Sequence, residues 1–200
     1  MELGFFGYYL IFINVIGFIA YAINNWLYAN TAESQIDTVL TIVALLGGSA
    51  GILLYILLFD RKAVKGNMMS RVFVACIFVI QIVLFLFFKS PKSGPTVNSI
   101  VQFFEKYIVL WIYLGIINVV TFVAFAVDKW AAVNQSSRIR IVTLLGLAFI
   151  GGSIGALLAM YIMRHKTRKD YFVVGVPLIM VMQLVVLIYL LTRWISNHRG

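Results

Sequence analysis

Apolar residues are gathered into six long runs along the chain, and the polar residues are concentrated between these runs. Each run is about 20 residues long, which is the length that an α-helix needs to cross the hydrocarbon core of a bilayer. The runs lack the alternating polarity, over roughly ten residues, of membrane β-barrel strands. The pattern therefore predicts an all-α, polytopic integral membrane protein. The expected spans are Leu3–Tyr28, Ile36–Phe59, Val72–Phe88, Tyr107–Val127, Ile141–Met163 and Phe172–Leu191.

The second half of the chain repeats the first half, and through the first two apolar runs of each half the shift is 104 residues without a gap. Agreement between polar residues and glycines at one fixed offset indicates an internal duplication. We expect one three-segment repeat at 1–88 and another at 107–200, joined at 89–106 by a linker and a short interfacial helix. The matched positions include Asn14 and Asn118, Trp26 and Trp130, and the motifs Gly47-Gly48-Ser49-x-Gly51 and Gly151-Gly152-Ser153-x-Gly155.

The number of crossings in each repeat decides how the two repeats are oriented. Three crossings would turn the second repeat upside down relative to the first, which is the inverted arrangement of many transporters. Alternatively, each Gly-Gly-Ser segment is a re-entrant hairpin that enters and leaves on one side. The positive-inside rule favours the hairpin, because the hairpin gathers more Lys and Arg residues on one side. Segment length favours six crossings in inverted repeats, since a bend leaves backbone polar groups to satisfy. We expect six crossings in two inverted repeats.

Composition and charge narrow the class of partner. Hydrophobic residues make up 62% of the chain, charged residues make up 12%, and the net charge is +9. Because the Lys and Arg residues lie between or just beyond the apolar runs, we expect contact with anionic membrane lipids and no nucleic-acid partner. Cys76 is the single cysteine, so a disulfide within the chain is excluded. We expect neither a cofactor nor a metal site.

Three motifs in the second half carry a family resemblance. They are Asp128-Lys129, Gly151-Gly152-Ser153-x-Gly155 and Arg164-His165-Lys166-Thr167-x-Lys169. In this order and spacing, over about Asn118–Leu191, the chain resembles the bacterial membrane family known as domain of unknown function 1294. The resemblance implies a multi-pass protein of the bacterial cytoplasmic (inner) membrane and names no reaction.

The chain departs from the family pattern at two places. Ile141-Val142 stand where that family usually has a Pro-Glu pair, so any role of that acid is missing here. The first half looks like a decayed copy, because Asn24-Asn25 replaces the Asp-Lys pair. If one half keeps a functional site, we expect it to be the second.

Amides and glycines inside the apolar runs form one set of candidate site residues. Amides in hydrocarbon need hydrogen-bond partners, so these side chains either join helices or build a polar site at the midplane. The small-xxx-small glycine motifs indicate either close helix packing or a helix break. The amides are Asn14, Asn118, Gln81 and Gln183; the glycine-rich positions are Gly47, Gly48, Ser49, Gly51, Gly151, Gly152, Ser153 and Gly155.

Charged residues at the ends of the apolar runs form the second set. We expect the basic cluster at 164–169 to set topology and to contact anionic lipid headgroups, with a phosphate-bearing ligand as the alternative. For Asp128 and Lys129 we expect interfacial anchoring, with pairing of Asp128 to a basic loop, as a gate or a headgroup site, as the alternative. The set comprises Asp128, Lys129, Arg164, His165, Lys166, Arg168 and Lys169.

These patterns leave three functional hypotheses. The first is a transporter or channel-like protein for a small solute or ion, with a pseudo-two-fold midplane site. The second is a lipid-interacting or regulatory scaffold that uses its basic loops. The third is a membrane enzyme that acts on a lipid-linked phosphate; we expect no enzyme activity, because the sequence shows no catalytic set.

Overall fold

The computed structural model describes residues 5–30, 37–61, 67–88 and 97–198. Every regular element in these ranges is helical, which confirms the expected all-α fold. Six segments within the described residues are long and apolar enough to cross a membrane, as expected for a multi-pass protein. Most of the expected linker, 89–96, lies outside the described residues. The chain divides into two compact units, unit 1 at Met1–Ile82 and unit 2 at Val83–Gly200.

Unit 1 is built from two long helices with a broken segment between them. Its core contains apolar side chains from all parts of the unit, including Ile13 and Tyr21 of the first helix and Ile52 and Ile56 of the broken segment. The elements are α1 (Phe5–Asn30), α2 (Asp37–Val43), the π-helical turn η1 (Ala44–Gly48), α3 (Ser49–Leu58) and α4 (Met68–Phe88), the last of which ends beyond the unit boundary.

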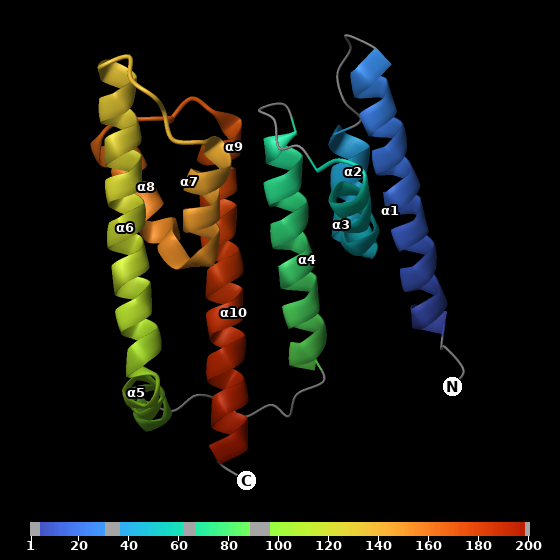
Figure 1. Cartoon of the computed structure of the whole chain (residues 1–200). Helices are drawn as coiled ribbons and strands as arrows, with labels where there is room; N and C mark the ends of the chain where they lie inside the picture. The colour runs from blue at the N-terminus through green and yellow to red at the C-terminus, as the bar shows by residue number, and fades with distance from the viewer. Residues whose placement is uncertain (1–4, 31–36, 62–66, 89–96, 199–200) are drawn as a thin grey trace. The chain divides into compact units, whose positions relative to one another are not determined.

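Unit 2 has the same succession of long, broken and long segments, preceded by a short amphipathic helix (Figure 1). Its elements are α5 (Val97–Lys106), α6 (Ile108–Val133), α7 (Ile141–Leu147), the π-helical turn η2 (Ala148–Gly152), α8 (Ser153–Ile162), α9 (Asp170–Val173) and α10 (Gly175–His198).

A glycine with a left-handed backbone breaks the central segment of each unit. Gly47 in η1 has φ 112°, and Gly151 in η2 has φ 132°. Residues with a Cβ rarely adopt such values, so glycine is required at the bend. Length and hydropathy made Ile36–Phe59 and Ile141–Met163 look like continuous spans, whereas each is a pair of short helices joined at a bend.

The broken segment of unit 2 turns back on itself and leaves at the end where it entered. The backbone amide of Ile139, just before α7, donates to Asp128 near the end of α6. The bend lies lower along α6, where the Tyr113 hydroxyl donates to the Ile150 carbonyl. After α8 the chain is back at Asp128, which contacts His165. Figure 1 shows the resulting hook between α6 and α10.

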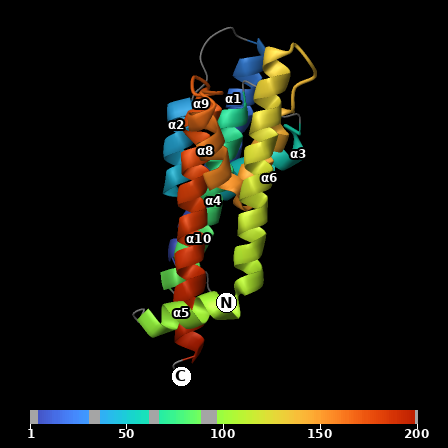
Figure 2. The same cartoon turned by 90° about the vertical axis from the view of Figure 1, so that its left-hand side faces the viewer.

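The opposite end of unit 2 is closed by aromatic side chains. The helix α5 lies across this end beside α6 and α10 (Figure 2). Phe103 of α5 and Trp194 of α10 are buried here, with their ring centroids 5.9 Å apart. Trp111 of α6 packs against the same cluster. The expected short helix before the fourth span is therefore present, and it is held by aromatic contacts.

Candidate functional site

A glutamine holds the bend of the unit 2 hairpin from the side of α10. The Gln183 side-chain Nε2 donates to the carbonyls of Ala148 and Phe149, at 2.7 Å and 3.0 Å. Its Oε1 accepts a hydrogen bond from the hydroxyl of Ser153, which is buried. Gln183 therefore supplies side-chain donors to the backbone where the regular helix is interrupted.

An asparagine holds the same bend from the side of α6. The Asn118 Nδ2 donates to the carbonyls of Leu114 (2.7 Å) and Gly151 (3.0 Å). Its Oδ1 accepts from the backbone amide of Gly155 at 2.7 Å. A Cβ on Gly155 would overlap the Asn118 carbonyl oxygen, so the close approach of α8 to α6 requires glycine at this position.

The bend of unit 1 is held by the same residue types. Asn14, Ser49 and Gly51 fit the 104-residue offset, whereas Gln81 lies 102 residues before Gln183. The Gln81 Nε2 donates to the carbonyls of Ala44 and Leu45, and its Oε1 accepts from the Ser49 hydroxyl. The Asn14 Oδ1 accepts from the Gly51 amide at 2.7 Å. We call the hydrogen bonds that Asn, Gln and Ser side chains make around each bend, together with a tyrosine bond described below, the tip clamp of that unit.

All four amides predicted for a midplane site form hydrogen bonds in the tip clamps. Each primary amide has two N–H donors, and both donors of Gln183 and of Asn118 go to backbone carbonyls. The structure brings Asn118 and Gln183 together around one bend, and Asn14 and Gln81 around the other. These side chains therefore satisfy the protein's own backbone.

Two tyrosines complete the tip clamps, and the sequence analysis missed them. The Tyr113 hydroxyl donates to the Ile150 carbonyl, and the Tyr9 hydroxyl donates to the Leu46 carbonyl, both at 2.8 Å. The available signal was the 104-residue offset, which carries Tyr9 onto Tyr113.

Asp128 ties both ends of the unit 2 hairpin together. Its carboxylate is fully buried. One oxygen, Oδ1, accepts from the Ile139 amide at 3.0 Å, and the other, Oδ2, lies 2.9 Å from His165 Nε2 and 2.6 Å from Lys166 Nζ. Asp128 was predicted either to anchor α6 or to pair with a basic loop, and the structure places it in contact with the loop. We call these contacts the end lock of unit 2.

Lys166 is the cation that neutralises the end lock. Its ammonium lies 4.7 Å from the centroid of the Phe172 ring, a cation–π contact that adds to the ion pair. Burial lowers the pKa of Lys166, although Asp128 acts in the opposite direction. Lys166 has a left-handed backbone, with φ 62°, which returns its side chain to α6. The ammonium is therefore held inside the protein and depends on Asp128 for compensation.

The remaining basic residues of this end point outward. The sequence from 128 to 170 contains seven cations and two acids, Asp128 and Asp170. Since Asp128 is occupied by Lys166, the exposed cations give this end a positive surface, which we call the basic end of unit 2. Its exposed members are Arg138, Arg140, Arg164, Arg168 and Lys169, with Lys129 half-buried beside them.

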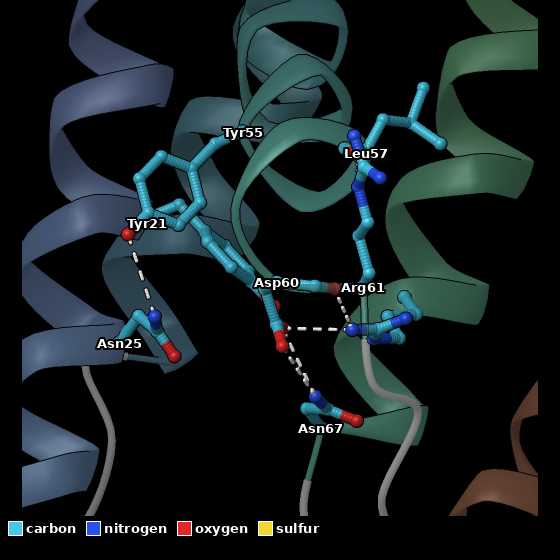
Figure 3. A network of polar contacts seen from close by, with 8 residues as sticks. Tyr21, Asn25, Tyr55, Leu57, Asp60, Arg61 and Asn67 are labelled. Atoms are coloured by element: carbon cyan, nitrogen blue, oxygen red, sulfur yellow. Dashed lines mark hydrogen bonds and ion pairs between the residues drawn. The ribbon is translucent and has the colours of Figure 1, made fainter.

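Unit 1 has an end lock of its own, built from different residues (Figure 3). Asp60, which follows α3, accepts from the Tyr21 hydroxyl of α1 at 3.1 Å and from Asn67. Its Oδ2 also lies 3.0 Å from the Arg71 guanidinium of α4. The first half was expected to be a decayed copy, yet it retains an ion pair in which the loop supplies the acid and the helix supplies the cation.

Together, the apolar helices, the clamped hairpins and the charged ends define a class of protein: a helical, multi-pass membrane protein with broken helices. Residues 118–172 match the model of a family described as "Protein of unknown function (DUF1294)". The chain is also 35% identical, over 75 residues, to the "Uncharacterized protein YsdA" of Bacillus subtilis (strain 168). That match covers 38% of this chain and 84% of the relative.

The protein belongs to the DUF1294 family, as the motifs around Asp128, Gly151 and His165 predicted. The family match includes the start of the tip clamp at Asn118 and ends at Phe172, the aromatic partner of Lys166. It therefore contains the whole unit 2 hairpin and its end lock. No solved structure matches the chain.

Proposed function

We propose that this protein is a multi-pass protein of the bacterial inner membrane that binds anionic phospholipid headgroups through the basic end of unit 2. The observation that carries the proposal is the end lock. Asp128 draws the segments on either side of the hairpin to one point and neutralises Lys166 internally. The outward-pointing arginines of both segments then share one surface.

The chemistry of the basic end suits a phosphate diester. Arginine presents a planar fork of donors that matches two phosphate oxygens, and it keeps its charge at every physiological pH. Near an anionic leaflet each such cation contributes about 1 kcal/mol, and the contribution is screened by salt. Exposed arginines on both sides of the hairpin, at Arg138, Arg140, Arg164 and Arg168, supply several such contributions at one end of the unit.

Spin-labelled lipids in nanodiscs that contain the full-length protein test this proposal. We expect spin-labelled phosphatidylglycerol to associate with the protein in preference to phosphatidylcholine, and the preference to fall as salt rises. Replacing Arg138, Arg140, Arg164 and Arg168 by Gln should bring the preference close to that of the neutral lipid. The matched control is Lys106→Gln, an exposed cation on α5 at the opposite end of unit 2.

The outcomes distinguish headgroup binding from a general effect of net charge and from binding of free phosphate compounds. An unchanged preference in the four-residue variant would overturn the proposal. An equal loss with Lys106→Gln would reduce it to a general effect of net charge. Competition by soluble glycerol phosphate at millimolar concentration would show that the site takes free phosphate compounds, which contradicts a headgroup site that requires the bilayer.

Transport of a small solute or ion is a second candidate, and the two helix breaks favour it. Broken helices form the substrate sites of many transporters. Here, however, the donors of Asn118 and Gln183 are used by the tip clamp, so a solute would have to replace protein hydrogen bonds. Flux of a panel of ions and small solutes into proteoliposomes tests this function. Fluxes that are the same with and without the protein would reject it.

A further inference from the structure

The hairpin of unit 2 is too short to cross a bilayer in either of its arms. At 1.5 Å per residue, the seven residues of α7 rise about 10 Å and the ten residues of α8 rise about 15 Å. The hydrocarbon core is about 30 Å thick, so the bend lies near its centre. By contrast, the 26 residues of α6 extend about 39 Å and the 24 residues of α10 about 36 Å, enough to span.

Backbone at this depth is tolerated only where its polar groups are satisfied by the protein. The tip clamp meets this requirement in unit 2. The carbonyls of Ala148, Phe149, Ile150 and Gly151 accept from side chains of Gln183, Tyr113 and Asn118, and the Gly155 amide donates to Asn118. The bend of unit 2 therefore has protein partners for these backbone groups, as a bend inside the membrane requires.

Charge at the two ends of unit 2 gives the hairpin a direction. The end that carries Asp128 also carries Lys129, Arg138, Arg140, Arg164, Lys166, Arg168 and Lys169. The described residues of the opposite end contribute Lys106 and Arg193. Basic residues in short loops are retained on the cytoplasmic side.

We infer that Ile141–Ile162 is a re-entrant hairpin, that unit 2 crosses the membrane twice, through α6 and α10, and that the residues on both sides of the hairpin face the cytoplasm. The expectation of six crossings counted this segment as a span. Two crossings leave a unit with both ends on one side. The inverted arrangement, which required three crossings in each repeat, then loses its basis.

The contacts of unit 1 indicate that its central segment is a hairpin as well. Along α1, Tyr9, Asn14 and Tyr21 bond in turn to Leu46, Gly51 and Asp60, so α3 runs parallel to α1. The chain leaves α3 at the end of the unit where α4 begins, since Arg71 near the start of α4 contacts Asp60. The inference does not depend on lipid binding by the basic end.

Accessibility of single cysteines in intact cells tests the inference in the full-length protein. Cys76 is first replaced by Ala, and cysteines are then placed singly at Ser136, Thr167 and Asn197, all of which are exposed. Ser136 precedes the hairpin, Thr167 follows it and Asn197 marks the far end of α10. A membrane-impermeant maleimide should label Asn197→Cys in intact cells. It should label Ser136→Cys and Thr167→Cys only after permeabilisation.

Each other outcome overturns a stated part of the inference. Labelling of Ser136→Cys and Thr167→Cys on opposite sides would show that Ile141–Ile162 crosses the membrane. Labelling of both in intact cells would keep the hairpin and reject the cytoplasmic assignment. Labelling of Asn197→Cys together with Thr167→Cys would mean that α10 does not cross. Lys169→Cys, also exposed, replaces Thr167→Cys if that variant is not produced at the level of the parent protein.

Discussion

At the hairpin tips, units 1 and 2 use the same residue types to hold matched backbone carbonyls, whereas their end locks share no residue type except an aspartate. In unit 2 the acid is Asp128 on α6 and its cation is Lys166 in the loop. In unit 1 the acid is Asp60 beyond α3 and its cation is Arg71 on α4. Position 24, which the 104-residue offset matches to 128, carries Asn.

The difference indicates which hydrogen bonds the fold requires from particular residue types. At each bend two neighbouring carbonyls face the long helix that follows, and one glutamine with two N–H donors bonds to both. Few other side chains can do so, and both units keep the glutamine. An end lock only has to hold a loop against a helix, and this can be done with the acid on the helix and the cation in the loop, or the reverse. The two units therefore differ where the physical requirement is looser.

The largest loss of stability is expected at the end locks, and it should differ between the two units. Asp128→Asn should lower the free energy of unfolding by about 3–5 kcal/mol, because it leaves the Lys166 ammonium inside the protein without its counter-charge. Asp60→Asn should cost less, about 1–3 kcal/mol, because the Asp60 side chain is 13% exposed while that of Asp128 is fully buried; the two cations, Arg71 and Lys166, are equally exposed at 16%. Unfolding by dodecyl sulfate in mixed micelles measures both.

Two controls accompany the comparison of the locks. Asp170→Asn removes an exposed acid from the same end and should be nearly neutral. The double variant Asp128→Asn/Lys166→Met removes the ammonium as well and should recover part of the loss. Equal losses for Asp128→Asn and Asp60→Asn would show that burial does not distinguish the two locks.

Close packing at the hairpins gives the next largest effect, and here the two units should agree. Gly155→Ala and Gly51→Ala each place a Cβ onto the backbone carbonyl of the facing asparagine. Each substitution should therefore destabilise the protein by about 1–3 kcal/mol. Gly115→Ala and Gly146→Ala are matched controls, because a Cβ there meets nothing within 4 Å. Those controls should be neutral or slightly stabilising in a helix. Similar losses at all four glycines would contradict the packing argument.

Removal of the clamp glutamines should have a moderate and equal effect in the two units. Gln183→Leu and Gln81→Leu each delete two donors to backbone carbonyls and one acceptor for a buried serine. Hydrogen bonds of this kind within a membrane are worth about 1–2 kcal/mol by model-peptide studies. Gln102→Leu on the exposed side of α5 is the control. A loss in one unit without a loss in the other would mean that the matched bonds differ in strength.

How far the sequence could predict this architecture depends on what each signal measures. Hydropathy and length predicted all six apolar segments, and the 104-residue offset predicted the pairs Asn14/Asn118 and Gly151/Gly47. Hydropathy reports how apolar a segment is and not the path it takes, so it could not distinguish a span from a hairpin at Ile141–Ile162. The positive-inside rule pointed to the hairpin, and the contacts of Asp128 at both of its ends agree.

The end locks were harder to predict because they depend on side chains distant in the sequence. Asp128 and Lys166 are separated by the entire hairpin, and the loop has to adopt a left-handed backbone at Arg164 and Lys166 for them to meet. In unit 1, Asp60 lies in the loop that follows α3. Its partners Tyr21 and Arg71 lie on two different helices, so no local pattern marks them.

The smallest expected effect tests whether the tyrosine hydroxyls belong to the tip clamps. Tyr113→Phe and Tyr9→Phe keep the aromatic ring and remove one donor to a carbonyl at the bend. Each should cost about 0.6 kcal/mol, the average for a side-chain hydrogen bond in a membrane protein. Tyr161→Phe, at a residue that is 71% exposed, is the control and should be neutral.

A double-variant cycle tests whether the tyrosine and glutamine bonds at one bend are coupled. If Tyr113 and Gln183 act on one bend, the loss in Tyr113→Phe/Gln183→Leu should depart from the sum of the single losses by at least about 0.5 kcal/mol. The partner pair Tyr9→Phe/Gln81→Leu should show the same coupling in unit 1, because its bonds are made to matched carbonyls. Additive losses in both units would mean that the hydroxyls and the glutamines stabilise the bend independently, so the tip clamp would be a set of separate bonds.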